Sequence, residues 1–412
     1  MSTMLPLLVQ QQHGGVIASG TPSQYATYSV QVDWDNDDDY TGTYDQLVGM
    51  SGYGVKSVRI RRGRDDELSQ MVAGEATIVL HDPDGRFNPS NASSPLDGLI
   101  LPMRKVYITA SNDGGATTYP LFGGFIRSVE HNPERGVQET TINCIDQFAR
   151  FSRKLAYADV SGFGNYTTGE AIFYFVNLDN ATGDTSEVSL LGDDLANVSN
   201  RLLYATGERS ILDEIQRFLE LERGTFWMNS AGNPHYETRY AKGARSSSAT
   251  FTDVMVGARP GIDLDAIGNY AQVTKTGNTA QEASDATSIA AYGRSDITPI
   301  DSELLIDDSQ AAALASYLVA TRKDPRPPIY GLDLMNRDAD TMTQILTREL
   351  QDRITIVDTR GGTSGDYHIE SITHDISDGG KFHRCTWGCS LRQAEAFVVG
   401  VSTVGGTDVL SY

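Results

Sequence analysis

Apolar and polar residues alternate along several short segments towards both ends of the chain. In the first part, the clearest examples are Val55–Arg61, Glu75–Leu80, Lys105–Ala110 and Thr140–Ile145. A period of two places every second side chain on one face, as in a strand that is buried on one side. Short strands at this spacing, with turn residues and no long helix between them, predict an antiparallel barrel or sandwich.

Two of the predicted hairpins resemble each other. Phe125–His131 and His368–His374 are each followed by a polar turn containing glycine and then by a second strand, over 138–144 and 383–391. The matched positions are Ile126 with Ile369, Ser128 with Ser371, Val129 with Ile372, His131 with His374, and Gly136 with Gly379. The likeness predicts an internal repeat. Chance likeness is the alternative, because ordinary hairpins share turn chemistry.

The middle of the chain changes character after Arg153. Ser210 is a typical N-cap for a helix whose apolar face includes Ile211 and Phe218, and Gly224 stands where a C-cap is expected. Two short strands follow, and together they predict a small α/β unit. We expect their aromatic side chains to pack on the helix rather than form a ligand platform; these are Phe226, Trp227 and Tyr236.

The pattern becomes β again at Tyr270–Thr276 and then predicts a second helix. Asp308 or Ser309 would cap this helix, and Asp324 with Pro325 would end it. Its apolar face is formed by Ala311, Leu314, Ala315 and Leu318. Further expected elements are strands at Ile329–Leu334 and Arg353–Val357, and a short helix or turn at Thr341–Leu350.

Composition narrows the class of protein. The 412 residues carry a formal net charge of −21, which repels phosphate backbones and argues against nucleic-acid binding. No apolar run has the length of a membrane span, and the first residues lack the basic segment of a signal peptide, so we expect folding in a cytoplasm. Three cysteines, at positions 144, 385 and 389, are too few for a disulfide framework.

Two groups of residues contain side chains of the kinds that bind metals. His383, Cys385 and Cys389 lie on one predicted strand, but their spacing is not that of a zinc knuckle, so we expect buried side chains instead. Asp33, Asp35 and Asp37 alternate like the first ligands of a calcium loop. The glycine expected at position six is Asp38 and the acid expected at position twelve is Tyr44, with Asp45 one place late. We therefore favour a solvated acidic turn over a Ca²⁺ site, and we expect no metal or other cofactor.

The sequence signals for a catalytic site are equally weak. The chain has no nucleophile elbow, phosphate loop, His-Glu-x-x-His motif or cysteine nucleophile context. Carboxylate pairs occur as chance supplies them in an acidic chain, for example Asp65 with Glu67 and Asp301 with Glu303. His131 and His374 occupy matched strand ends, which favours a shared structural role over catalysis. We predict no catalytic residues and no enzyme.

Several of these segments resemble a known family. The run Gly74–Pro89, the strand Tyr119–Arg127 and the strand Ile142–Asp146 are similar to the first barrel of phage tail hub proteins, also called baseplate hub, tail-tip or minor tail proteins. The hub part of type VI secretion spike proteins is similar too. Ile211–Ile215 with Gly232–Tyr236 resembles the insert between the barrels of such hubs. The closing barrel is matched by Ala312–Arg322, Arg353–Val357 and Tyr367–His374. The resemblance covers roughly Val55 to Gln393 and rests on element order.

The resemblance implies a β-rich α+β fold with two tube-type antiparallel β-barrels related by an internal repeat. The expected domains are an N-terminal arm (1–45), a first barrel (46–153), an inserted helix-hairpin α/β domain (154–262), a second barrel (263–395) and a C-terminal tail (396–412). In such hubs three chains form a pseudo-sixfold ring at the tail tip of the virion. The ring joins the sixfold tail tube to the threefold tip and encloses the channel for DNA ejection.

The implied partners are two further copies of the chain, a distal tail ring or tail tube protein, and a tip, spike or fibre protein. Genomic DNA or a tape measure protein would pass through the lumen. The alternatives are a hexameric distal tail adaptor with one barrel per chain, a tail-associated peptidoglycan hydrolase, and a carbohydrate-binding receptor protein. A receptor would expose aromatic side chains in loops, whereas the tryptophans lie on or beside predicted strands, at positions 34, 227 and 387.

Overall fold

The computed structural model describes residues 20–50, 53–65, 70–134, 136–158, 168–179, 189–191, 205–238, 241–242, 245–252, 267–325, 329–359 and 362–391. The start of the expected N-terminal arm and the whole expected C-terminal tail lie outside these ranges. Within the described part of the chain, no helix combines the length and the apolar composition that crossing a membrane would require.

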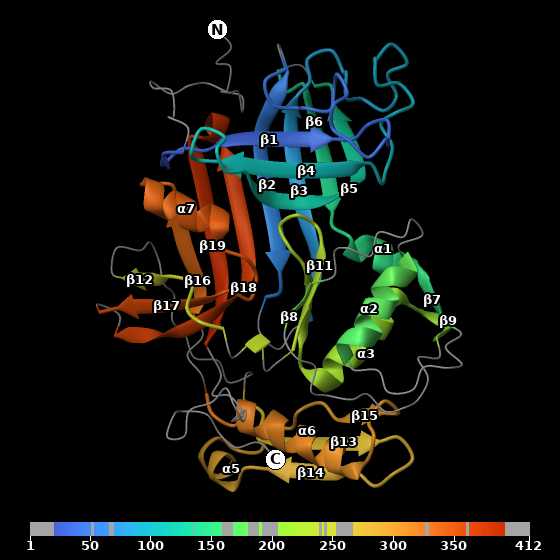
Figure 1. The fold of residues 1–412 in the computed structure, drawn as a ribbon, viewed down its shortest axis with the longest axis vertical. Helices are drawn as coiled ribbons and strands as arrows, with labels where there is room; N and C mark the ends of the chain where they lie inside the picture. The colour runs from blue at the N-terminus through green and yellow to red at the C-terminus, as the bar shows by residue number, and fades with distance from the viewer. Residues whose placement is uncertain are drawn as a thin grey trace.

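One large, mostly antiparallel sheet contains strands from both ends of the chain (Figure 1). Its order is β1-β4-β5-β6-β3-β2-β18-β17-β12, with β19 paired to β18 and β16 paired to β19. In Figure 1, β1 and β4 cross over β2 and β3, so the sheet curls into part of a barrel. Its strands are β1 (Thr27–Val32), β2 (Gly54–Gly63), β3 (Val72–His81), β4 (Lys105–Ser111), β5 (Tyr119–Asn132), β6 (Glu139–Ile145), β12 (Thr250–Thr252), β16 (Ile329–Met335), β17 (Arg353–Asp358), β18 (Thr363–Ser377) and β19 (Phe382–Leu391).

The alternation in the sequence accounts for the way these strands bury one face. In β3, Ala76, Ile78 and Leu80 are buried in the core, while the side chains between them are more exposed. The turns of the two hairpins also agree with the sequence, because Gly136 and Gly379 both have a positive φ, which favours glycine. The β-rich α+β class expected from the sequence is confirmed. All described strands of the expected first barrel and four of the expected second barrel, β16, β17, β18 and β19, belong to one continuous sheet.

The inserted unit packs beside the sheet. It contains α1 (Phe148–Arg153), β7 (Leu155–Ala158), α2 (Thr168–Asp179), β8 (Ser189–Leu191), β9 (Ala205–Ser210), α3 (Ile211–Glu222), β10 (Thr225–Met228) and β11 (Pro234–Glu237). Ser210 is the N-cap of α3, as expected, and it forms a capping box with Asp213. The C-cap is Arg223, with φ 56°, and not Gly224. Gly224 is needed for a different reason, because a Cβ there would lie 2.7 Å from the Glu237 carbonyl oxygen.

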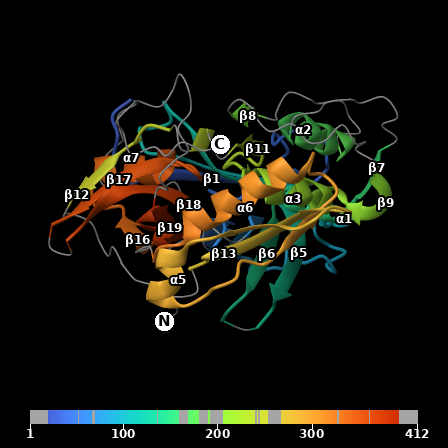
Figure 2. The same cartoon turned by 90° about the horizontal axis from the view of Figure 1, so that it is seen from below.

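A second small unit lies between β12 and β16 in the sequence. It contains β13 (Tyr270–Lys275), β14 (Gln281–Ser284), α5 (Ala286–Tyr292), β15 (Ile300–Ser302) and α6 (Asp308–Arg322). Figure 2 shows α6 lying across β13, and the buried face expected for α6 forms the core of this unit. Asp307 caps α6 by accepting a hydrogen bond from the Gln310 amide, so the cap lies one residue earlier than expected.

The elements fall differently from what the expected domains suggested. Thr27–Val32 of the expected arm form β1, which pairs with β4 in the main sheet. The three-stranded sheet of β13, β14 and β15 lies within the range assigned to the second barrel, yet it pairs with none of that range's other described strands. The chain returns to the main sheet through β16, α7 (Ala339–Thr347), β17 and β18, and the short helix η1 (Asp378–Gly380) precedes β19.

Candidate functional site

The two halves of the main sheet meet where β2 pairs with β18, and we call this pairing the seam. Seven residues of β18, Ser371–Ser377, lie opposite Gly63–Ser57 of β2 in an antiparallel register. The backbones approach most closely at Gly63, which has φ 99° and where a Cβ would lie 2.1 Å from the Glu370 carbonyl oxygen. Only glycine satisfies both conditions at this position.

A buried carboxylate stands at the end of the seam. Glu370 is 1% exposed and accepts hydrogen bonds from Arg64 (2.7 Å) and Gln351 (2.9 Å) at one oxygen, and from Lys242 (2.9 Å) and Ser390 (2.5 Å) at the other. Burial acts to raise the pKa of Glu370, but the charges of Arg64 and Lys242 outweigh it and hold the pKa well below its usual value. The carboxylate thus links β2, the inserted unit and the C-terminal strands.

A second ion pair ties the inserted unit to the same place. Arg62 of β2 donates to Glu349 at 2.6 Å, and the other Glu349 oxygen accepts from the Ser230 amide in the β10–β11 turn at 2.7 Å. Burial acts to raise the pKa of Glu349, but Arg62 and the backbone amides lower it overall. The turn also packs directly on the sheet, since a Cβ on Gly123 would lie 2.0 Å from the Ala231 carbonyl oxygen.

A chain of neutral polar groups reaches the middle of the seam, where His374 lies opposite Ile60. Tyr28 of β1 is hydrogen-bonded to Nδ1 of His383 at 2.8 Å, and Nε2 of His383 is hydrogen-bonded to Nδ1 of His374 at 2.9 Å. Burial lowers the pKa of His383 to about 3, and burial together with the neighbouring His383 lowers that of His374 well below its usual value. Both imidazoles are therefore neutral at physiological pH, and they connect the first strand of the sheet to its last.

The two hairpins singled out from the sequence share a bulge at the same place. The register of β5 against β6 shifts at Arg127, directly after Ile126. The register of β18 against β19 shifts at Glu370, directly after Ile369. Both isoleucines are fully buried, and each lies opposite a cysteine of the neighbouring strand, Cys144 or Cys389. Bulges are specific features that re-aim a strand, so a matched bulge is informative.

The residues just before β4 and β17, the strands that pair with β5 and β18, also have matching backbone conformations. Met103 and Gln351 both have a left-handed backbone, with φ 69° and 66°. Their amides donate to the carbonyl oxygens of Ile126 and Ile369 at 2.8 and 2.7 Å. In return, the amide of Ile126 donates to the carbonyl oxygen of Arg104 at 2.9 Å, and the amide of Ile369 donates to that of Asp352 at 3.0 Å. This conformation is uncommon for residues other than glycine, so its occurrence at matched positions supports the likeness of the two hairpins.

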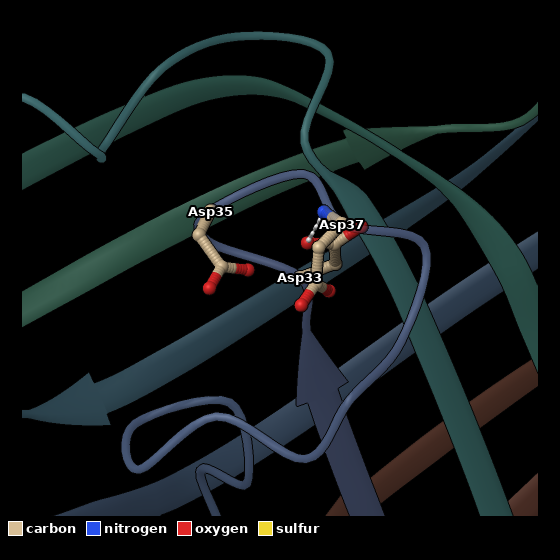
Figure 3. A group of neighbouring side chains, drawn as sticks. All are labelled: Asp33, Asp35 and Asp37. Atoms are coloured by element: carbon tan, nitrogen blue, oxygen red, sulfur yellow. Dashed lines mark hydrogen bonds between the residues drawn. The ribbon is translucent and has the colours of Figure 1, made fainter.

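The structure brings the three aspartates of the acidic turn together (Figure 3). Carboxylate oxygens of Asp33, Asp35 and Asp37 lie within 4.8 Å of one another. The buried Asp33 carboxylate accepts hydrogen bonds from the amides of residues 36–38, at 2.6, 3.2 and 3.1 Å. Asp38 is paired with Lys105 at 2.6 Å. The arrangement is that of a capped turn, and whether it binds Ca²⁺ stays a prediction.

The other candidate residues are separated or already paired. Cys385 and Cys389 are free and buried, and burial raises the pKa of each thiol. His131 is hydrogen-bonded to Thr140 at 2.9 Å and lies beside a polar pocket of about 450 Å³. Asp301 accepts from Thr276, Glu303 is paired with Arg217, and Glu67 lies outside the described residues. The aromatic side chains of the β10–β11 hairpin are buried, and Phe226 packs against Phe148 and Phe151 of α1 rather than on α3 alone.

The fold is similar to that of known tail proteins. The 43 kDa tail protein of prophage MuSo2 from Shewanella oneidensis matches with a TM-score of 0.59 and 12% identity, over 88% of this chain and 98% of that chain. A tail protein from Neisseria meningitidis MC58 matches with a TM-score of 0.56 and 12% identity, over 88% of this chain and 96% of that chain. Prophage tail protein gp18 from Listeria monocytogenes EGD-e matches with a TM-score of 0.52 and 11% identity, over 88% of this chain and 94% of that chain.

The likeness lies in structure rather than sequence, since no protein-family model and no curated protein matches this sequence. It covers 88% of this chain and nearly the whole of each tail protein. The chain therefore has the fold of these prophage tail proteins, in agreement with the resemblance found in the sequence.

Proposed function

We propose that this chain is a structural protein of the virion, located in a phage tail. The support is the fold, which it shares with prophage tail proteins over most of its length. The buried polar groups of the seam are consistent with a mechanical role, because their hydrogen bonds hold strands from distant parts of the chain together. Ion pairs of this kind fix geometry more than they add stability.

Within that role we infer a hub at the tail tip or baseplate, formed by three chains. Each chain would contribute two related β-modules, β3-β6-β5-β4 and β16-β19-β18-β17, which are joined by β2. The matched bulge at Arg127 and Glu370 is the observation that carries this proposal. Three chains with two modules each would place six similar surfaces on a ring, which joins a sixfold tube to a threefold tip.

The partners follow from this position. One face of the ring would meet a distal tail ring or tail tube protein, and the other a tip, spike or fibre protein. Genomic DNA or a tape measure protein would pass through the lumen, and the net charge of −21 keeps DNA from adhering to it. Mass photometry of the purified chain tests the hub: trimers are expected, and hexamers would favour a distal adaptor ring instead.

The proposed role is not enzymatic. Asp301 and Glu303, a candidate carboxylate pair, are each engaged by a neighbouring side chain. His374 is buried and neutral beside His383. Zymography on bacterial cell walls tests this: no clearing is expected. Clearing that is lost on a single carboxylate substitution would establish a hydrolase.

A further inference from the structure

We propose that the polar pocket beside His131 binds an arginine side chain of the tip, spike or fibre protein. The pocket has a volume of about 450 Å³ and lies where the turn between β5 and β6 meets the loop that follows β3. The inference rests on the proposed hub, because it names the chemistry by which one partner of the hub is recognised. It comes from comparing the surroundings of the two histidines at matched strand ends.

In the second hairpin the histidine is covered by its own chain. His374 is hydrogen-bonded to His383, and Tyr28 of β1 is hydrogen-bonded to the other ring nitrogen of His383. All three side chains are buried. Strands β1 and β19 thus enclose the histidine of this hairpin.

The first hairpin lacks this cover. Counted along the paired strands, the residue that matches His383 is Gln138, and its side chain donates to the carbonyl oxygen of Pro83 at 3.1 Å. No aromatic side chain takes the place of Tyr28 among the described residues that line the pocket. The position next to His131 that is filled in the second hairpin is therefore part of an open pocket in the first.

The hydrogen bonds of His131 determine which ring nitrogen is an acceptor. The Thr140 hydroxyl donates its one proton to Asp82 at 2.6 Å, so it can only accept from Nδ1 of His131, 2.9 Å away. In the neutral ring the proton therefore lies on Nδ1, and Nε2 carries a lone pair. The His131 side chain is only 10% exposed. Its Nε2 lies on the side of Gly85, where a Cβ would be 3.5 Å away.

The pocket adds negative charge to this acceptor. Asp82 and Asp84 both line it, and the described lining residues include no lysine or arginine. Tyr53 donates to one oxygen of Asp84, and the other oxygen has no hydrogen-bond donor in the described part of the chain. Arg86 follows in the sequence, but its guanidinium stacks 3.8 Å from the centre of the Tyr53 ring and does not line the pocket.

The amide side chains around the pocket are already engaged by the loop. Asn91 donates to the carbonyl oxygen of Gly85 at 2.9 Å, and Gln138 donates to that of Pro83. An incoming group must therefore bring both positive charge and several donors. Arginine does so, because its guanidinium is always charged and carries five N–H donors in a fixed plane.

The presence of the pocket in one module only indicates which partner fills it. A ring of three chains would carry the pocket three times, while the matched position at His374 is covered. A sixfold partner offers the same side chain to every module, whereas a threefold partner offers one per chain. The pocket therefore suits the threefold tip, spike or fibre protein rather than the tail tube.

Binding can be measured on the purified chain by long-range ¹H–¹⁵N NMR of histidine-labelled protein, with Nα-acetyl-arginine amide as the probe. The Nε2 signal of His131, identified by its loss in His131→Gln, should be that of an unprotonated nitrogen. It should shift saturably as the probe is added, and the neutral analogue Nα-acetyl-citrulline amide should cause no shift. The signals of His374 and His383 should stay unchanged and serve as internal controls for folding.

Two substitutions test the role of the charge. Asp84→Asn should weaken probe binding by about tenfold or more, because hydrogen bonds between charged groups contribute that much. The matched control is Asp97→Asn, which alters an exposed aspartate of the same loop that does not line the pocket, and it should bind as the wild type does. A His131 signal that does not respond to the probe, or that responds equally in Asp84→Asn, overturns the arginine site.

A reconstruction of the assembled tail separates this inference from the hub itself. An arginine from a protein present in three copies is expected within hydrogen-bond distance of Asp84 and of Nε2 of His131. A threefold ring in which the pocket faces solvent, or receives a protein present in six copies, overturns the assigned partner and leaves the hub standing. A chain that binds the probe but never forms trimers keeps the arginine site and overturns both the hub and the assigned partner.

Discussion

Removing the charge of Glu370 is the sharpest perturbation of the seam. The side chain is 1% exposed and faces two cationic groups, Arg64 and Lys242, together with the neutral donors of Gln351 and Ser390. Glu370→Gln keeps the shape of the side chain but removes its charge. Its amide nitrogen, which is a hydrogen-bond donor, must then face other donors in place of one carboxylate oxygen. Breaking a buried ion pair by altering one partner costs about 3–5 kcal/mol, because the remaining charge stays buried without compensation.

The matched control is Glu75→Gln, which breaks the pair between Glu75 and Arg127 on the surface of the same sheet. Both side chains there are more than half exposed, 59% and 63%, and such pairs contribute at most about 1 kcal/mol. Urea unfolding can be followed by the fluorescence of the three tryptophans, Trp34, Trp227 and Trp387, which are all buried. Glu370→Gln should move the midpoint far more than the control. Equal shifts for the two variants would refute the role assigned to Glu370.

Three further predictions concern other parts of the structure. Because burial holds the pKa of His383 at about 3, below the unfolded value near 6.5, the neutral form stabilises the fold above pH 6.5 and this contribution is lost on acidification. Between pH 7.5 and 5 His383→Gln should therefore lose about 2 kcal/mol less stability than the wild type, and parallel pH profiles would contradict this. Gly63→Ala should cost about 3 kcal/mol or more, against about 1 kcal/mol for Gly277→Ala, which has φ 88° but open space around it; similar melting temperatures would contradict the close approach at the seam. Added Ca²⁺ should leave the melting temperature unchanged, and an upward shift that Asp35→Asn abolishes would show that the acidic turn is a calcium site.

The sequence predicted the strands well because their burial follows from local alternation. Both hairpins, the α3 cap at Ser210 and the buried face of α6 were recognisable for the same reason. The pairing of β2 with β18 could not be recognised from the sequence, since it joins segments about 300 residues apart and depends on the curl of the sheet. The left-handed Arg223 was missed because glycine is the residue usually found in that conformation at a helix end, and Gly224 is the next residue.

The Glu370 cluster could not be assembled from the sequence. Its donors come from Arg64, Lys242, Gln351 and Ser390, which lie in four separate segments. A signal was nevertheless present, because Glu370 interrupts an otherwise alternating strand between Ile369 and Ser371, where a bulge allows the carboxylate to turn inward. The equivalent position holds an exposed arginine, so a comparison of the two copies would have pointed to a difference in their surroundings.

A reconstruction of the ring that this chain forms in an assembled tail tests the central claim most directly. The account predicts three chains, with the hairpins β5–β6 and β18–β19 alternating around the axis at equal radius and height, so that six matched positions appear under threefold symmetry. A ring of six chains, or three chains whose two hairpins lie at different radii, would contradict it.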